Sequence, residues 1–127
     1  IGAVVLLISV FLVYSTHSEK LVITPKVIST SPGNGSQDVD PAIREISVAF
    51  SEPMTDKSWS WSYEDKKKFP QTTGEPYYTD NFTRCVLPVK LEPKKEYVIW
   101  INTAKLKNFK SKNGIPVDPY KLTFKTR

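Results

Sequence analysis

Proline punctuates this chain so often that a long helix has little room to form. Ten prolines fall between positions 25 and 119, and an interior proline breaks a helix because it lacks the backbone N–H. No stretch between two of them carries an apolar repeat of about 3.6 residues over the length of a substantial helix. The sequence therefore predicts an all-β domain.

Apolar residues that recur at every second position predict the strands of this domain. In residues 43–50, Ile46, Val48 and Phe50 fall on one face, which is the period of a half-buried strand. Other strands are expected at 26–30, 58–63, 76–78, 83–89, 98–102 and 122–126. About seven strands at this spacing are typical of an immunoglobulin-like antiparallel β-sandwich.

A turn over residues 91–97 delivers Tyr97 to the head of the apolar strand expected at 98–102. This arrangement is similar to the tyrosine corner of immunoglobulin-like sandwiches, in which the phenol reaches back to upstream backbone. We therefore expect a structural role for Tyr97, with its hydroxyl donating a buried hydrogen bond.

Three segments together carry a resemblance to a known family. They are residues 27–35 with 39–41, residues 46–54, and the ending formed by 113–116 and 122–126. In combination they resemble the bacterial Ig-like domain of the surface-layer, SbsA-like (Big_5) family. The resemblance covers residues 25–127, and it implies an antiparallel β-sandwich outside the cytoplasm that serves as a spacer, adhesion or binding module. It implies no catalytic residues.

An aromatic row lies in the middle of the chain, where the sequence is longer than in short members of that family. Trp59, Trp61 and Tyr63 alternate with three serines and would share one face of a strand. Such a row could be the inner face of a central strand, where sandwiches commonly bury a tryptophan, or a platform on which sugars stack. We expect at least one tryptophan in the core. Three large rings are hard to bury completely, so the end of the row is a candidate binding face.

The first fourteen residues are apolar and uncharged, unlike everything that follows. As a helix they would rise about 21 Å, whereas a bilayer core of about 30 Å needs ~20 residues. The run therefore also fits the apolar region of a signal peptide. The candidate anchor residues are Val4, Val5, Leu6, Leu7, Ile8, Val10, Phe11, Leu12, Val13 and Tyr14.

The end of this run favours an anchor over a cleaved signal. Tyr14 stands where an interfacial aromatic belongs, and residues 15–20 form a polar exit without a distinct cleavage motif. We expect a single transmembrane helix over residues 1–17, a linker over 18–24 and the sandwich over 25–127. A cleaved signal peptide, or a buried strand or helix of the domain, is the alternative.

Few residues offer catalytic or metal-binding chemistry. His17, the only histidine, lies next to the expected membrane segment, so no Ser/His/Asp arrangement is expected. Cys85 is a lone cysteine in an apolar stretch, where a buried inert thiol is expected. Four carboxylates could be drawn together as a calcium site, but their spacing does not match an EF-hand loop: Asp38, Asp40, Glu52 and Asp56. The sequence predicts no enzyme, cofactor, metal or small-molecule substrate.

The charge narrows the class of partner. The net charge is +5, and the lysines are scattered except at 66–68 and 105–112. Arginine is sparse, whereas a nucleic-acid protein should show arginines on a helix or an aromatic strand motif. We expect no nucleic acid, and an acidic protein surface or anionic lipid headgroups instead.

These observations predict a non-catalytic accessory subunit in the bacterial inner membrane. Its sandwich would cap a larger membrane protein complex from the periplasm, and an energy-transducing complex (respiratory or photosynthetic) is one candidate. Its partners would be the other subunits and the lipid bilayer. The alternative is a cell-surface module for carbohydrate or protein adhesion. A solvent-exposed, coplanar row at Trp59, Trp61 and Tyr63 would favour glycan binding, and burial would favour the subunit.

Overall fold

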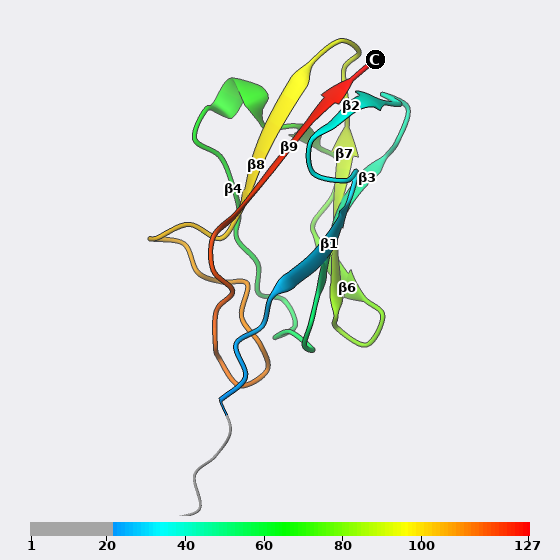
Figure 1. The fold of residues 1–127 in the computed structure, drawn as a ribbon. Coiled ribbons are helices and arrows are strands. Elements are labelled where there is room, and N and C mark those ends of the chain that lie inside the picture. Colours follow the sequence, from blue (N-terminus) through cyan, green and yellow to red (C-terminus); the bar gives the residue numbers. More distant parts are fainter. Residues whose placement is uncertain (1–21) are drawn as a thin grey trace, which may run out of the picture.

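Nine strands and one short 3-10 helix make up residues 22–127, the part of the chain that the computed structural model describes (Figure 1). The transmembrane helix expected over residues 1–17 lies outside the described residues. The elements are β1 (Val27–Ser31), β2 (Ser36–Val39), β3 (Glu45–Phe50), β4 (Trp61–Ser62), η1 (Lys66–Lys68), β5 (Gln71–Thr72), β6 (Tyr77–Thr79), β7 (Arg84–Lys90), β8 (Glu96–Ile101) and β9 (Tyr120–Thr126).

The strands form two sheets that face each other. One sheet has the order β1-β3-β7-β5, with β6 also paired to β7, and the other has the order β2-β9-β8-β4. Every pair within these sheets is antiparallel except β2 with β9, which is parallel. The expected all-β sandwich is therefore confirmed, and β4 and β5 stand at the edges of the two sheets.

The strands that the sequence pattern missed or made too long are short, with two to four residues each. β2 and β5 were not expected, because neither has a run of apolar residues. Of the strand expected over 58–63, only β4 forms, because the residues before it make hydrogen bonds to the connection between β8 and β9 and not to a neighbouring strand. Ser58 Oγ donates to the Asn108 carbonyl at 2.6 Å, and Ser60 Oγ accepts from Asn108 N at 3.0 Å.

The core fills the space between the sheets and divides into two clusters. Around one end, Ile46, Leu87 and Ile99 pack with Leu122 and Phe124. Towards the other end, the second cluster holds Val48, Phe50, Met54, Cys85, Ile101, Phe109 and Val117. Ile46, Val48 and Phe50 all lie in the core, because alternate residues of β3 point to one side of its sheet.

A single buried amide organises the long connection between β8 and β9. Asn102 is fully buried, and its Nδ2 donates to the carbonyls of Phe109 at 2.9 Å and Val117 at 3.0 Å. Its Oδ1 accepts from Phe109 N at 2.9 Å. Asn102 also has a positive φ of 62°, which asparagine tolerates better than most residues. The connection is thus fixed from inside the core.

The chain enters and leaves the sandwich at opposite ends (Figure 1). Residue 22 lies at the lower end beside the connection between β8 and β9, and Arg127 follows β9 at the upper end. Residues 22–127 contain no helix with the length and apolar character that crossing a membrane requires.

Candidate binding face

The aromatic row runs along the edge of the sandwich that β4 forms. Trp61 meets Phe109 edge to face, with ring centroids 5.3 Å apart and an interplanar angle of 85°. Trp59 packs against Tyr78 at 6.4 Å, and Tyr63 packs against Phe69 at 5.7 Å. Both tryptophans are half-buried, whereas Tyr63 is 50% exposed. The solvent exposure therefore differs along the row, with half-buried tryptophans and an exposed tyrosine, and the row is not a flat, exposed platform.

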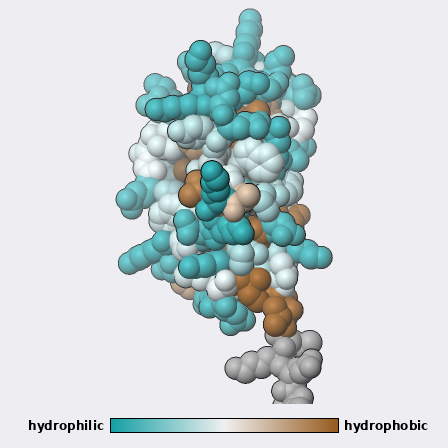
Figure 2. All heavy atoms as spheres, turned by 90° about the vertical axis from the view of Figure 1, so that its left-hand side faces the viewer, coloured by the Kyte–Doolittle hydropathy of each residue, from teal (hydrophilic) through white to brown (hydrophobic). Residues whose placement is uncertain are grey.

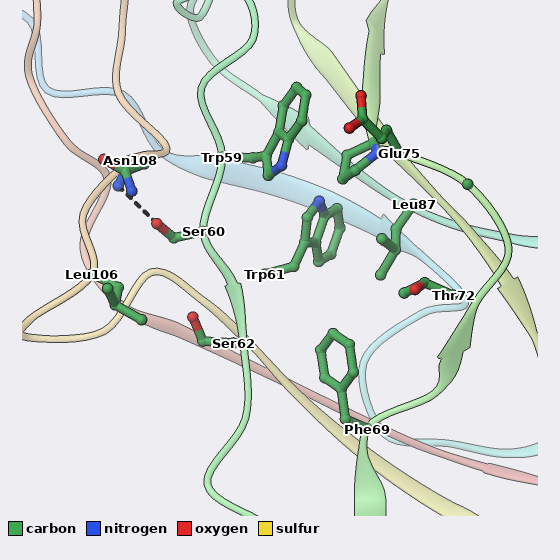
Figure 3. A pocket seen from close by; sticks show the side chains of 12 residues that line it. Trp59, Ser60, Trp61, Ser62, Phe69, Thr72, Glu75, Leu87, Leu106 and Asn108 are labelled. Carbon is green, nitrogen blue, oxygen red and sulfur yellow. Dashed lines mark hydrogen bonds between the residues drawn. The ribbon is translucent and has the colours of Figure 1, made fainter. Parts of the chain in front are cut away.

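The two tryptophans line a hollow between the sheet edges, called here the aromatic recess. Its volume is about 520 Å³, and Trp59, Trp61 and Phe69 form its aromatic lining, with Thr72 and Glu75 as polar groups. Figure 3 shows the Trp61 indole between the rings of Trp59 and Phe69, with the Glu75 carboxylate near Trp59. A hollow of this size is in the range of small-molecule sites.

The indole nitrogen of Trp61 has an unusual environment. Its Nε1–H is buried and has no nitrogen or oxygen acceptor among the described residues, but it lies close enough to the Cys85 thiol to lower the pKa of that thiol, against the larger effect of burial. Figure 3 shows that this nitrogen points toward Trp59, away from Phe69.

A second hollow, called here the basic cleft, opens at the upper end of the same edge. Its volume is about 710 Å³, and it shares Phe69 with the aromatic recess. One wall carries Lys66 and Lys67 of η1, and the other carries the turn between β7 and β8, with Lys90 and Lys95. Figure 2 shows hydrophilic side chains gathered at this upper end of the molecule.

The first wall of the basic cleft is fixed by local hydrogen bonds. Asp65 caps η1 with its Oδ1, which accepts from Lys67 N at 3.0 Å. Lys68 turns away toward β8, where its Nζ lies 3.3 Å from Glu96 Oε1. Lys66 and Lys67 are exposed and have no ion-pair partner within residues 22–127.

Tyr97 fixes the second wall. Its hydroxyl accepts a hydrogen bond from Glu92 N at 2.8 Å, so the phenol reaches upstream backbone but as an acceptor, the reverse of the donation expected. Thr126 Oγ1 donates to the Glu92 carbonyl at 2.6 Å and accepts from Lys95 N at 2.9 Å. The Tyr97 ring is buried and stacks on Phe124 at 5.3 Å.

Within residues 22–127, the only ion pair in the basic cleft is formed by two residues of its second wall. Lys95 Nζ lies 2.7 Å from Glu92 Oε2. Its hydrogen bond holds the pKa of the Glu92 carboxyl below the ordinary range, and the same contact raises the pKa of Lys95. Lys90, by contrast, has no such partner among the described residues.

The nucleophilic and phenolic groups near the aromatic recess are held protonated. Cys85 is fully buried, and burial raises the pKa of its thiol to about 12. Burial also raises the pKa of Tyr78 far above its ordinary value, and the Tyr78 hydroxyl bonds to the Ser58 carbonyl at 2.5 Å. The thiolate is the reactive form of cysteine, so Cys85 is inert at neutral pH.

The carboxylates weighed as a calcium site do not come together. Asp38 and Asp40 lie near Arg127 at the upper end. Their Oδ2 atoms are 4.0 and 3.3 Å, respectively, from the nearest nitrogen of the Arg127 guanidinium. Glu52 lies beside Ile23 at the other end, and Asp56 accepts from the adjacent Lys57 N. Within residues 22–127, no three histidine, cysteine or acidic side chains are grouped as metal ligands.

Comparisons with known proteins agree with this architecture. The model of the family described as bacterial Ig-like domain (Big_5) matches residues 22–126. A crystal structure of the S-layer protein rSbsC is similar over 83% of this chain, with a TM-score of 0.51 and 16% identity. A structure of domains 1–6 of the surface layer protein SbsC is similar over 84% of it, with a TM-score of 0.52 and 16% identity.

These two likenesses are limited to the fold at that level of identity. This chain spans 14% of each of the two longer chains. No curated protein matches the sequence.

Proposed function

Because the chain belongs to the family of bacterial Ig-like domains, we propose that it is a non-catalytic accessory module of the bacterial inner membrane. In this proposal, residues 1–17 anchor it in the bilayer, and its sandwich contacts a larger membrane protein complex from the periplasm. The resemblance to this family implies a spacer, adhesion or binding module without catalytic residues, which supports a role without catalysis.

The observation that carries this proposal is an exposed apolar pair at the lower end of the sandwich. Val22 is 73% exposed and Ile23 is 53% exposed. Figure 2 shows hydrophobic side chains at the lower end, beside the grey atoms. Val22 and Ile23 continue, in sequence, toward the uncharged run of residues 1–14. Apolar surface at this end suits contact with a bilayer or a membrane protein.

The neighbourhood of this pair also fits a membrane surface. Ile23 borders a small hollow with Pro53 and Lys112. The Lys112 ammonium lies 4.5 Å from the centre of the Phe82 ring. Lysine next to aromatic and apolar side chains can meet anionic headgroups while its stem covers apolar surface. The basic cleft at the upper end would then face away from the bilayer.

Fractionation of cells that express the full chain tests the proposal. The full chain should sediment with membranes, resist a carbonate wash and co-elute with other proteins in mild detergent, which mass spectrometry would identify. Deletion of residues 1–20 should give a soluble, folded monomer. A full chain that is soluble without detergent would refute the anchor.

A pair of surface variants tests the contact made by the lower end. Replacing Val22 and Ile23 with serine should reduce the amount of co-eluting protein while leaving the chain in the membrane fraction. The matched control is Ile28→Ser, because Ile28 is 65% exposed on β1 but lies outside that pair. Equal loss in both variants would mean that the lower end has no special role.

The aromatic recess favours a second candidate function, the binding of a glycan at the cell surface. Trp59 and Trp61 could stack on a sugar ring while Glu75 and Thr72 bond to its hydroxyls. Affinity electrophoresis of the full chain against neutral polymers of glucose, mannose and N-acetylglucosamine tests this function. Retardation that Trp59→Ala removes and Tyr77→Ala preserves would support it; no retardation by any polymer would refute it.

A further inference from the structure

We infer that the basic cleft binds an acidic segment of a partner protein, in which apolar side chains stand among the carboxylates. This inference rests on the proposed accessory function and names the chemistry of one contact with the partner. It concerns the upper end of the sandwich, away from the apolar pair Val22 and Ile23.

The charge of the cleft is the first argument. Four lysines and one glutamate line it: Lys66, Lys67, Lys90, Lys95 and Glu92. Since Lys95 and Glu92 pair with each other at 2.7 Å, the three remaining lysines set the sign of the field. Charges of one sign that converge on a concave surface attract and orient an oppositely charged partner. Such lysines would otherwise repel one another.

The backbone that carries these lysines is fixed before any partner arrives. The Asp65 cap holds η1 on one side. On the other side, the hydrogen bonds of Tyr97 and Thr126 hold the turn at Glu92. The β5–β7 pairing, with Gln71 opposite Lys90, sets the distance between the walls. A preformed site loses less conformational entropy on binding than a flexible one.

The aromatic lining indicates a polypeptide and not a small anion. Tyr63 is half exposed and leans on Phe69, so the cleft offers apolar surface beside its lysines. Tyrosine of this kind is enriched in protein interfaces. The positively charged residues are lysines, which act as point charges and attract carboxylates without requiring one fixed geometry. Carboxylates alternating with apolar side chains would match both parts of the lining.

Fluorescence anisotropy of the full chain in an uncharged mild detergent tests the inference. The probe is a short synthetic peptide of alternating glutamate and leucine with a fluorescent label. We expect binding that weakens as salt rises. The double variant Lys66→Gln with Lys67→Gln should raise the Kd about fivefold to tenfold, because two charge contacts are lost.

Matched changes separate the cleft from overall charge. The control is Lys105→Gln with Lys107→Gln, which lowers the net charge equally at an exposed loop outside the cleft and should change the Kd less than about twofold. Tyr63→Ala should weaken the glutamate–leucine peptide but not a glutamate–serine peptide. Equal weakening by both double variants would overturn the inference, since charge alone would then explain binding.

Two further outcomes would also overturn it. Polygalacturonate that competes as well as the peptide at equal charge would identify an anionic glycan as the ligand. The absence of any binding to the unaltered chain would remove the cleft as a site. Either result could occur while the chain still co-elutes with a membrane complex, so failure of this inference is distinguishable from failure of the proposed function.

Discussion

Removal of one hydroxyl group tests how the turn between β7 and β8 is held. Tyr97→Phe keeps the buried ring and its stacking on Phe124 but deletes the acceptor of the Glu92 N–H bond at 2.8 Å. A donor left without a partner costs about 1–3 kcal/mol. Because the Glu92 side chain is exposed and its backbone is only partly buried, water can reach part of this site. We therefore expect Tyr97→Phe to lower the free energy of unfolding by about 1–2 kcal/mol.

Urea unfolding, followed by tryptophan fluorescence, measures this loss. For an m-value of about 1–3 kcal/mol/M, the midpoint should fall by roughly 0.3–2 M without a change in slope. Tyr63→Phe makes the same chemical change at an exposed ring whose hydroxyl has no hydrogen-bond partner among the described residues, and it should shift the stability by less than about 0.5 kcal/mol. If both variants unfold at the same midpoint as the unaltered protein, the corner at Tyr97 contributes no measurable stability.

Three other outcomes are expected. Asn102→Ala should destabilise the domain by about 3–5 kcal/mol, because it removes three buried hydrogen bonds; urea unfolding with Asn108→Ala as the exposed control would show it. Cys85 should not react with Ellman's reagent until the protein unfolds, and fast reaction in native buffer would contradict its burial. The free energy of unfolding should decline as pH rises from about 9, where an unfolded thiol ionises, toward about 12, the raised pKa of Cys85. Tyr78, whose pKa is also raised, adds to this decline, and Cys85→Ala should remove the cysteine part of it in urea titrations at several pH values.

Much of the sandwich could be predicted from apolar residues alone. A period of two marks β3 because one of its faces meets the opposite sheet, and the turn before Tyr97 marks the head of β8. β2 and β5 gave no such signal, since each pairs at an edge through its backbone. The sequence pattern places Asn102 at the end of a strand, because nothing in it distinguishes a buried asparagine from one in a turn.

The binding face was less predictable, because it depends on contacts between residues that are far apart in the sequence. The lysine run at 66–68 was visible, but its neighbour Lys90 is far along the chain. The pairing of Gln71 with Lys90 and the ion pair of Lys68 with Glu96 bring the two walls together. The aromatic row was recognised as a row, yet the burial of Trp61 depends on Phe109, which reaches it from the connection between β8 and β9.

The placement of the two ends has a mechanical consequence. A pull between Val22 and Arg127 would act along β1 at the lower end and along β9 at the upper end (Figure 1). The ladder bonds of β1 with β3 and of β9 with β8 lie across the strands, so tension would load many of them at once in shear. β1 and β9 belong to different sheets, but β2 follows β1 along the chain and pairs in parallel with β9, so the force also passes between the two ends through the β2–β9 ladder. A domain connected in this way would resist stretching more than one that unzips bond by bond.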